Sequence, residues 1–239
     1  MRTRYSFFCD FDGTVSVRDV TDVLLETYAL PEWRDIEALW QAGDIGSMEC
    51  MQRQVSLLRC SRRQLDAVAD AVAIDPGFPD FVAACREAAM PVAIVSDGID
   101  YCIRRVLRQY GLDWLPVHAN RLTMSGDGRY ALTFPSAHAD CLSASGTCKC
   151  ARMRTLRQPG TTAVLIGDGA SDFCAAREEA DFVFAKGALL DFCREQALPH
   201  MAYTDFYDVK RVLSNPQQGP HDAERRAADP TFAGYFLHG

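Results

Sequence analysis

Residues 7–14 read FFCDFDGT, which combines the pattern of a buried strand with two carboxylates at its end. Three apolar residues precede Asp10, and only Phe11 separates Asp10 from Asp12. Two carboxylates this close repel each other, and both stay ionised away from bulk water only where a positive charge lies between them. The stretch therefore predicts a buried strand that ends at the binding site of a divalent cation, with further ligands elsewhere in the chain.

Length and composition indicate an ordinary globular protein. The chain has 239 residues, of which 48% are hydrophobic and 24% are charged, enough for one large domain or one domain with an insertion. The net charge of -7 argues against a nucleic-acid partner, which normally needs a basic face. It leaves room for a small phosphorylated metabolite, because a metal ion and a few local cations can reverse the field within a cleft.

The apolar runs are too short to predict a membrane partner or a secretion signal. None approaches the ~18 to 20 residues that span a bilayer. The basic start of the chain leads into an apolar stretch that stops at Asp10, too short for the core of a signal peptide. Ten cysteines scattered through the chain are then interpreted as reduced thiols, and we expect a cytoplasmic protein.

Periodicity predicts an α/β fold with a helical insertion. Between residues 17 and 73, apolar residues recur at helical spacing, which predicts three or four helices directly after the first strand. Strands and helices then alternate, which favours a doubly wound, mostly parallel, Rossmann-like sheet. We expect an α/β core of residues 1–16 and 75–214, a small helical-bundle cap of residues 17–74, and a carboxyl-terminal tail of residues 215–239.

The expected core elements follow from the same patterns. Strands are expected at residues 5–9, 91–95, 115–119, 162–166 and 182–184, with a hairpin of 122–124 and 130–134. Helices are expected at residues 78–89, 99–110, from 149 onward, 170–179, 189–197 and 205–213.

Polar residues follow several of the predicted strands. Ligands of parallel sheets bind outside the carboxyl ends of the strands. The residues found there, or on the approach to a helix, are Asp10, Asp12, Ser96, Asp97, Lys149, Asp168 and Asp172. Taken singly, each also fits a structural role, such as the N-cap of a helix or a solvated lysine. Their joint placement favours one shared site.

The residue types suit phosphoryl transfer through a covalent carboxyl phosphate. Asp10, first after the strand, is the candidate nucleophile, and Asp12 is the candidate acid and base. Mg²⁺ would take Asp10, the carbonyl of Asp12 and Asp168, with Asp172 in support. Phosphate oxygens would be held by Ser96 with the neighbouring amides, including that of Asp97, and by Lys149.

The motifs DFDGT, SDG, Lys149 and GDGASD resemble, in this order, the four motifs of the haloacid dehalogenase superfamily of phosphatases. The resemblance covers the whole core, and the helical insert is similar to the small helical cap of that family. It implies a Mg²⁺-dependent phosphatase with the roles given above. An acid at Asp12 favours phosphate chemistry, since the dehalogenating members lack it.

Two branches of the family remain open. RQVSLL and HANRL resemble the phosphoserine phosphatases, which place an arginine at Gln54 and a glutamate at Asp19. Arg53 is the candidate replacement for that arginine, so Asp19, Arg53 and Gln54 are candidate specificity residues of the cap.

The carboxyl-terminal third favours the other branch. CREQALPHMAYTDFYDVK, with CLSASGTCKC before it, resembles the phosphatases of 2-hydroxy-3-keto-5-methylthiopentenyl-1-phosphate, which serve methionine salvage in amino-acid biosynthesis. Phosphoserine phosphatase and phosphotransferase activity are the alternatives, and a non-catalytic regulatory protein is a further one. Either a monomer or a homodimer is compatible with the sequence.

Two further groups have competing interpretations. Cys141, Cys148 and Cys150, with His138 nearby, could bind zinc or respond to oxidation, but buried thiols are the favoured interpretation because the spacing fits no compact zinc module. Trp33 and Trp40 are interpreted as cap packing or as apolar surface for a thioether-bearing substrate.

Overall fold

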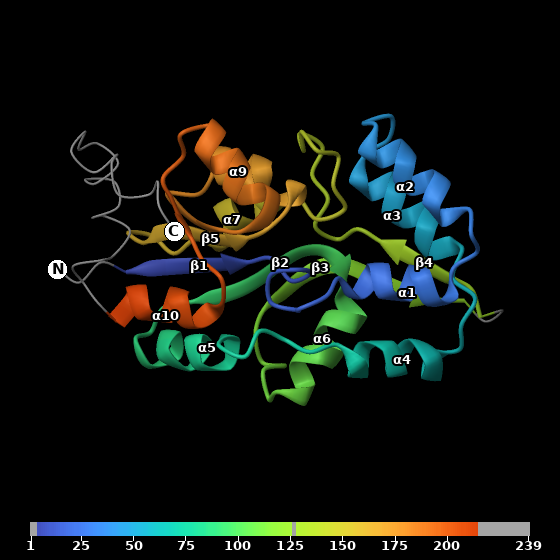
Figure 1. The fold of residues 1–239 in the computed structure, drawn as a ribbon, viewed down its shortest axis with the longest axis horizontal. Coiled ribbons are helices and arrows are strands. Elements are labelled where there is room, and N and C mark those ends of the chain that lie inside the picture. The colour runs from blue at the N-terminus through green and yellow to red at the C-terminus, as the bar shows by residue number, and fades with distance from the viewer. Residues whose placement is uncertain (1–3, 126–127, 215–239) are drawn as a thin grey trace, which may run out of the picture.

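A computed structural model describes residues 4–125 and 128–214, so the expected tail of residues 215–239 lies outside the described residues (Figure 1). Within these ranges, seven strands form one sheet in the order β4-β3-β2-β1-β5-β6-β7. The strands are β1 Tyr5–Cys9, β2 Val92–Ile99, β3 Val117–Met124, β4 Tyr130–Thr133, β5 Thr162–Gly167, β6 Phe182–Ala185 and β7 His200–Ala202. Every pairing is parallel except that of β3 with β4. The predicted doubly wound sheet is confirmed.

The first strand lies at the centre of the sheet and supplies both of its faces. It pairs with β2 on one side and β5 on the other. Because neighbouring side chains of a strand point to opposite faces, Phe7 and Cys9 join one apolar cluster and Phe8 joins the other. A strand buried on both faces is nearly continuously apolar, as this one is.

Helices cover each face of the sheet (Figure 1). The cluster that contains Phe7 and Cys9 is the larger one. It also includes residues of α5 Phe78–Glu87, α6 Asp100–Gln109 and α10 Phe206–Ser214. The smaller cluster, which contains Phe8, also includes residues of α7 Lys149–Leu156, α8 Phe173–Glu178 and α9 Gly187–Glu195. None of the described helices is long and apolar enough to cross a bilayer.

Four helices occupy the interval in which the cap was predicted: α1 Val20–Tyr28, α2 Trp33–Gln41, α3 Ser47–Ser56 and α4 Arg62–Ala71. Asp19 caps α1, and Ser61 caps α4 in a capping box with Gln64. An isolated antiparallel bridge joins Ser16 to Ile74, so the chain enters and leaves this interval at one place. The exact domain limits stay a prediction.

Three details of the core differ from the expected elements. The strand expected to end at Val95 continues to Ile99, with an irregular register in between. The segment from Val117 to Met124 is one strand instead of two. The edge strand β7 was not predicted, because three residues are too few to show a period of two.

Candidate active site

The predicted site residues converge at the carboxyl ends of β1, β2 and β5, beneath the cap helices. A cavity of about 280 Å³ lies there. Of the predicted residues, those that line it are Asp10, Asp12, Asp19, Gln54, Ser96, Asp97 and Asp168. Lys149 and Asp172 are buried and reach the cavity wall through Asp10. Arg53 is not among the lining residues.

The turn after β1 is shaped to bring these groups together. Gly13 has a φ of +72°, a conformation that glycine adopts without strain. A Cβ at this position would lie 2.5 Å from a carboxylate oxygen of Asp168. The loop after β1 and the loop after β5 therefore approach each other more closely than any residue other than glycine would allow at position 13. Thr14 then donates its hydroxyl to Asp168 at 2.6 Å, a contact that sequence reasoning missed although Thr14 belongs to the motif.

A buried lysine joins two of the acids. The Nζ atom of Lys149 lies 3.0 Å from Asp10 and 2.5 Å from Asp172, and it donates to the Ser171 hydroxyl at 2.8 Å. Burial alone would lower the pKa of Lys149, but the charges of Asp10 and Asp172 outweigh it and raise this pKa above its ordinary value. The two carboxylates therefore favour the charged form of Lys149 beside Asp10.

The two acids of the first motif differ in their surroundings. Burial raises the pKa of Asp10 to about 7, with Lys149 opposing this rise and Asp172 and Asp168 adding to it. Burial also raises the pKa of Asp12 well above its ordinary value, with Asp19 adding to the rise. The Asp12 carboxylate accepts the Val20 amide at 2.8 Å.

Three acids form a group that fits a hard divalent cation. Asp10, Asp168 and Asp172 each offer an oxygen within 4.8 Å of the others, the single group of this kind in the described ranges. Asp172 differs from the other two, since its oxygens also accept the Lys149 ammonium and the amides of Asp168 and Gly169. Asp172 thus positions Lys149 as well as contributing acidic charge.

Ser96 and Asp97 both line the cavity but differ in their hydrogen-bond partners. The buried Ser96 hydroxyl accepts the Gly98 amide at 3.0 Å, which leaves its own proton to be donated.

The Asp97 carboxylate is occupied by three donors. It accepts Ser47 Oγ from the cap, Asn120 Nδ2 at 3.0 Å and the Thr147 amide at 2.9 Å. A carboxylate only accepts hydrogen bonds, so the side chain of Asp97 links cap to core, and its amide is the part suited to a phosphate oxygen. No local sequence signal marks these three partners, which lie 23 to 50 residues from Asp97.

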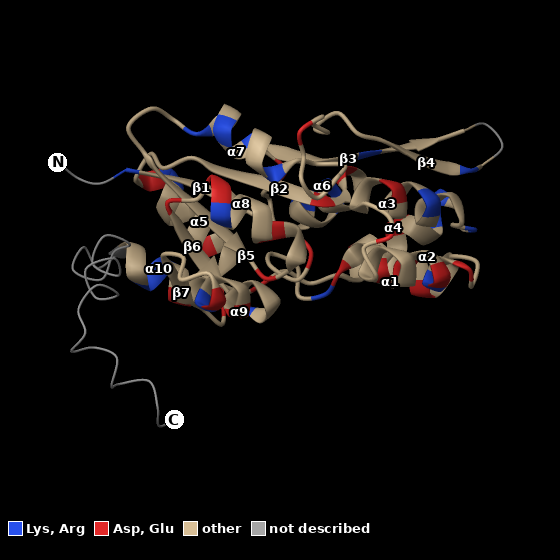
Figure 2. Cartoon of the chain, turned by 90° about the horizontal axis from the view of Figure 1, so that it is seen from above, with Lys and Arg blue, Asp and Glu red and all other residues tan. Residues whose placement is uncertain are grey.

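The cap side of the cavity contains one predicted aromatic residue. Trp40, Cys50 and Met51 line the cavity, whereas Trp33 is buried in the cap core. The Arg53 guanidinium lies on an exposed face, 3.2 Å from Glu49. Acidic residues gather on α1 and α2, as the red segments of Figure 2 show.

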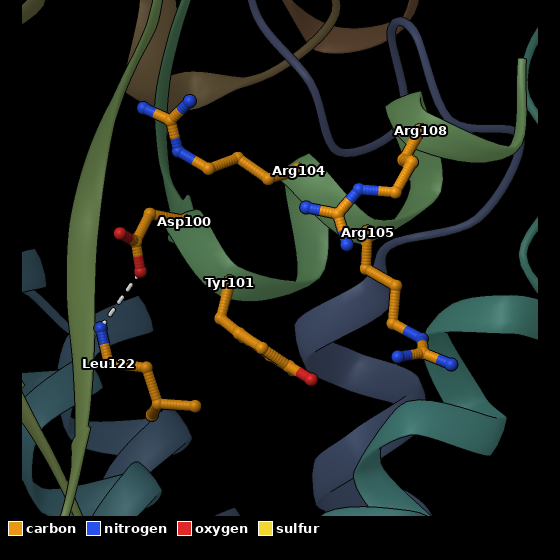
Figure 3. A pocket seen from close by; sticks show the side chains of 6 residues that line it. All are labelled: Asp100, Tyr101, Arg104, Arg105, Arg108 and Leu122. Carbon is orange, nitrogen blue, oxygen red and sulfur yellow. Dashed lines mark hydrogen bonds between the residues drawn. The ribbon is translucent and has the colours of Figure 1, made fainter. Parts of the chain in front are cut away.

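A second cavity, of about 170 Å³, lies along α6 and contains none of the predicted site residues (Figure 3). It is lined by Asp100, Tyr101, Arg104, Arg105, Arg108 and Leu122. Its charges are already engaged: Arg105 pairs with Asp66 and Asp70, and Asp100 accepts the Leu122 amide at 2.9 Å.

Cys141, Cys148 and Cys150 are the cysteines for which the sequence left a metal or redox role open. All ten cysteines of the chain belong to the described residues and are free thiols. Cys148 is buried, Cys141 and Cys150 are partly buried, and Cys150 Sγ lies 3.2 Å from that of Cys174. None of the three joins a group of metal-ligand geometry within the described ranges.

A doubly wound sheet with buried acids at its carboxyl edge and a helical insertion above them defines a class of α/β enzymes. A family model described as haloacid dehalogenase-like hydrolase matches residues 7–177. Proteins named 2-hydroxy-3-keto-5-methylthiopentenyl-1-phosphate phosphatase from Brevibacillus brevis and Geobacillus kaustophilus are 33% and 32% identical to the chain. These alignments cover 91% and 89% of this chain and 99% and 97% of the relatives.

A solved structure described as a phospho-aspartyl intermediate analogue of phosphoserine phosphatase matches with a TM-score of 0.65. The match covers 90% of this chain and 99% of that one at 17% identity, so it supports the fold alone. The chain belongs to the haloacid dehalogenase-like hydrolases, and it is a phosphatase. The resemblance noted in the sequence is confirmed.

Proposed function

We propose that the chain is a Mg²⁺-dependent phosphomonoesterase that works through a phosphorylated Asp10. The observation that carries this proposal is the placement of Asp10, which lines the cavity and lies 3.0 Å from Lys149. A carboxylate nucleophile beside a buried cation can approach the anionic phosphate ester that it attacks.

The steps follow from the side chains. A carboxylate oxygen of Asp10 attacks phosphorus and the bond to the ester oxygen breaks. Asp12, whose pKa is raised by burial, gives its proton to the leaving oxygen. Asp12 then takes a proton from a water molecule as the water attacks phosphorus, and the bond between Asp10 and phosphorus breaks to release phosphate.

The remaining groups hold and neutralise the phosphate. Lys149 and the Ser96 hydroxyl would bind its oxygens, with the amide of Asp97. Mg²⁺, held by Asp10, the carbonyl of Asp12 and Asp168, with Asp172 in support, would neutralise negative charge on the phosphate. The free thiols fit a cytoplasmic enzyme, and monomer or homodimer stays a prediction.

The proposed substrate is 2-hydroxy-3-keto-5-methylthiopentenyl-1-phosphate, the compound in the names of the relatives. The cap side of the cavity supports this choice, because Trp40 and Met51 offer apolar surface to a methylthio group. Phosphoserine is the second candidate, since both the fold and the motif RQVSLL are similar to those of its phosphatases.

The test is phosphate release by the purified protein with Mg²⁺, over a panel of the methylthiopentenyl phosphate, phosphoserine and unrelated sugar phosphates. The proposal expects the highest kcat/KM for the methylthiopentenyl compound. A preference for phosphoserine would replace the proposed substrate. Absence of Mg²⁺-dependent release from every ester would overturn the enzyme proposal itself.

A further inference from the structure

Part of the cavity wall on the cap side is formed by a hydrogen-bonded pair from two cap helices. Glu37 belongs to α2 and Gln54 belongs to α3, and both line the cavity. Gln54 Nε2 donates to a Glu37 carboxylate oxygen at 2.9 Å and to the Trp33 carbonyl at 3.4 Å. Gln54 is only 2% exposed, so these contacts fix its orientation.

The hydrogen-bond donors and acceptors of this pair limit what it can bind. An amide nitrogen carries two protons, and both protons of Gln54 are used. Its remaining polar atom, Oε1, only accepts, and so does a carboxylate such as that of Glu37. The pair therefore offers acceptors alone to a substrate.

The charges nearby agree with this count. Asp19 and Asp22 also line this side of the cavity, and none of its lining residues, all of which are described, is lysine or arginine. Arg53, the candidate ligand for a substrate carboxylate, pairs with Glu49 on an exposed face instead. A carboxylate in the tail of a substrate would meet three acids and no donor from Gln54.

We propose that Glu37, positioned by Gln54, determines the substrate class of the enzyme. It selects phosphate monoesters whose tail carries a hydrogen-bond donor, a hydroxyl or an ammonium group, and it rejects tails that carry a carboxylate. This inference rests on the proposed phosphomonoesterase function. The acceptors of Glu37 and Gln54 accommodate a substrate with a hydroxyl group in its tail. They disfavour phosphoserine, because that ester carries a carboxylate.

The test uses four small esters that differ only at the tail: 2-hydroxyethyl phosphate, ethanolamine phosphate, propyl phosphate and phosphoglycolate. The wild-type enzyme is expected to have a higher kcat/KM for the first two than for propyl phosphate, and the lowest value for phosphoglycolate. In Glu37→Gln, the ratio of ethanolamine phosphate to phosphoglycolate is expected to fall by about tenfold or more, since a paired charge is lost and a repulsion is removed. The change is expected in KM more than in kcat, and the value for propyl phosphate is the internal reference for each variant.

Two further variants separate recognition from general damage. Glu49→Gln removes a carboxylate from the exposed face of α3 and is expected to leave all four ratios unchanged. Gln54→Met removes the donor that positions Glu37 and is expected to shift the ratios in the same direction as Glu37→Gln, by a smaller factor. Each ratio is measured within one preparation, so partial unfolding cancels.

The outcomes also separate this inference from the proposed function. If propyl phosphate is hydrolysed with Mg²⁺ but Glu37→Gln leaves the ratios unchanged, the specificity role is wrong and the phosphomonoesterase stands. If phosphoglycolate is the best ester of the wild-type enzyme, the inference is likewise overturned. If the enzyme hydrolyses neither the four small esters nor the methylthiopentenyl compound, the proposed function is overturned, and this inference with it.

Discussion

The core side and the cap side of the cavity both contain carboxylates, but only the core side gives them a cation. On the core side, Lys149 contacts Asp10 and Asp172 within 3.0 Å. On the cap side, Glu37 accepts a neutral amide, and no lysine or arginine lines the cavity beside it. Charge is thus neutralised where the phosphate is expected to react, and left uncompensated where the tail of the substrate is expected to lie.

The contrast assigns different tasks to the two sides. A buried ion pair is sensitive to the loss of either partner, so the core side tolerates little change. Acceptors at the cap side can be altered without leaving a buried charge unpaired. We therefore expect substitutions in the core to abolish reaction or destabilise the fold, and substitutions in the cap to change the preferred substrate.

The largest effect is expected for Asp10→Asn, which removes the proposed nucleophile while keeping its shape. Turnover of every ester should fall by roughly three or more orders of magnitude. Phosphate release with Mg²⁺ measures it, and Asp113→Asn, at an exposed acid beside Arg108, is the matched control. Turnover near that of the wild type would refute Asp10 as nucleophile.

Lys149→Met should cost stability as well as activity. It leaves Asp10 and Asp172 buried without their cation, and breaking a buried pair costs about 3–5 kcal/mol. Urea unfolding without Mg²⁺ measures the loss. Arg211→Met removes a surface cation that pairs with Asp208, and it should change the free energy of unfolding by about 0.5 kcal/mol or less. Equal losses in the two variants would contradict the proposed contrast.

Stabilisation by Mg²⁺ should increase with pH. Burial raises the pKa of Asp10 to about 7, against Lys149 and with help from Asp172 and Asp168, whereas the unfolded chain releases this proton near pH ~4. The metal-free fold therefore binds more protons than the unfolded chain between these values, and its stability should fall as pH rises through them.

Because Mg²⁺ competes with that proton, the rise in Tm on adding it should be larger near pH ~8 than near pH ~5. Thermal unfolding with and without saturating Mg²⁺ measures the difference. Asp168→Asn, which removes a proposed ligand, should reduce the rise at both values. A rise that is the same at both pH values would argue against Mg²⁺ binding at Asp10.

The smallest effect is expected on the outer side of the cap. Ser61→Ala removes the cap of α4 and should lower the free energy of unfolding by about 1 kcal/mol. Ester preferences should stay as in the wild type, since Ser61 does not line the cavity. A changed preference would show that specificity extends beyond the cavity wall.

Local patterns in the sequence were sufficient for the core but not for the cap contacts. The apolar run Phe7, Phe8 and Cys9 predicts a strand that is buried on both faces. The acids after it mark the site, because the carboxyl ends of parallel strands lie at a common edge of the sheet. Glu37 and Gln54 meet across two helices, 17 residues apart. Their pairing depends on how the helices cross, and no periodic pattern encodes that angle.

Asp97 illustrates the same limit within the core. Its position after a strand predicted a place at the site, and it does line the cavity. The partners of its carboxylate come from a cap helix, from β3 and from the loop before α7. Such contacts are set by tertiary packing, so sequence reasoning assigned Asp97 a phosphate contact and missed its link to Ser47.

The bridge between Ser16 and Ile74 has a consequence for how substrate preference can be exchanged. Everything from Val17 to Ala73 leaves and rejoins the core at one paired point, so a graft of this interval from a relative needs only two adjacent splice junctions. Asp10, Lys149, Asp168 and Asp172 would stay with the recipient, and Glu37 and Gln54 would travel with the graft. The interval can thus be exchanged as a unit, which would change the substrate preference while the residues of the reaction centre stay the same.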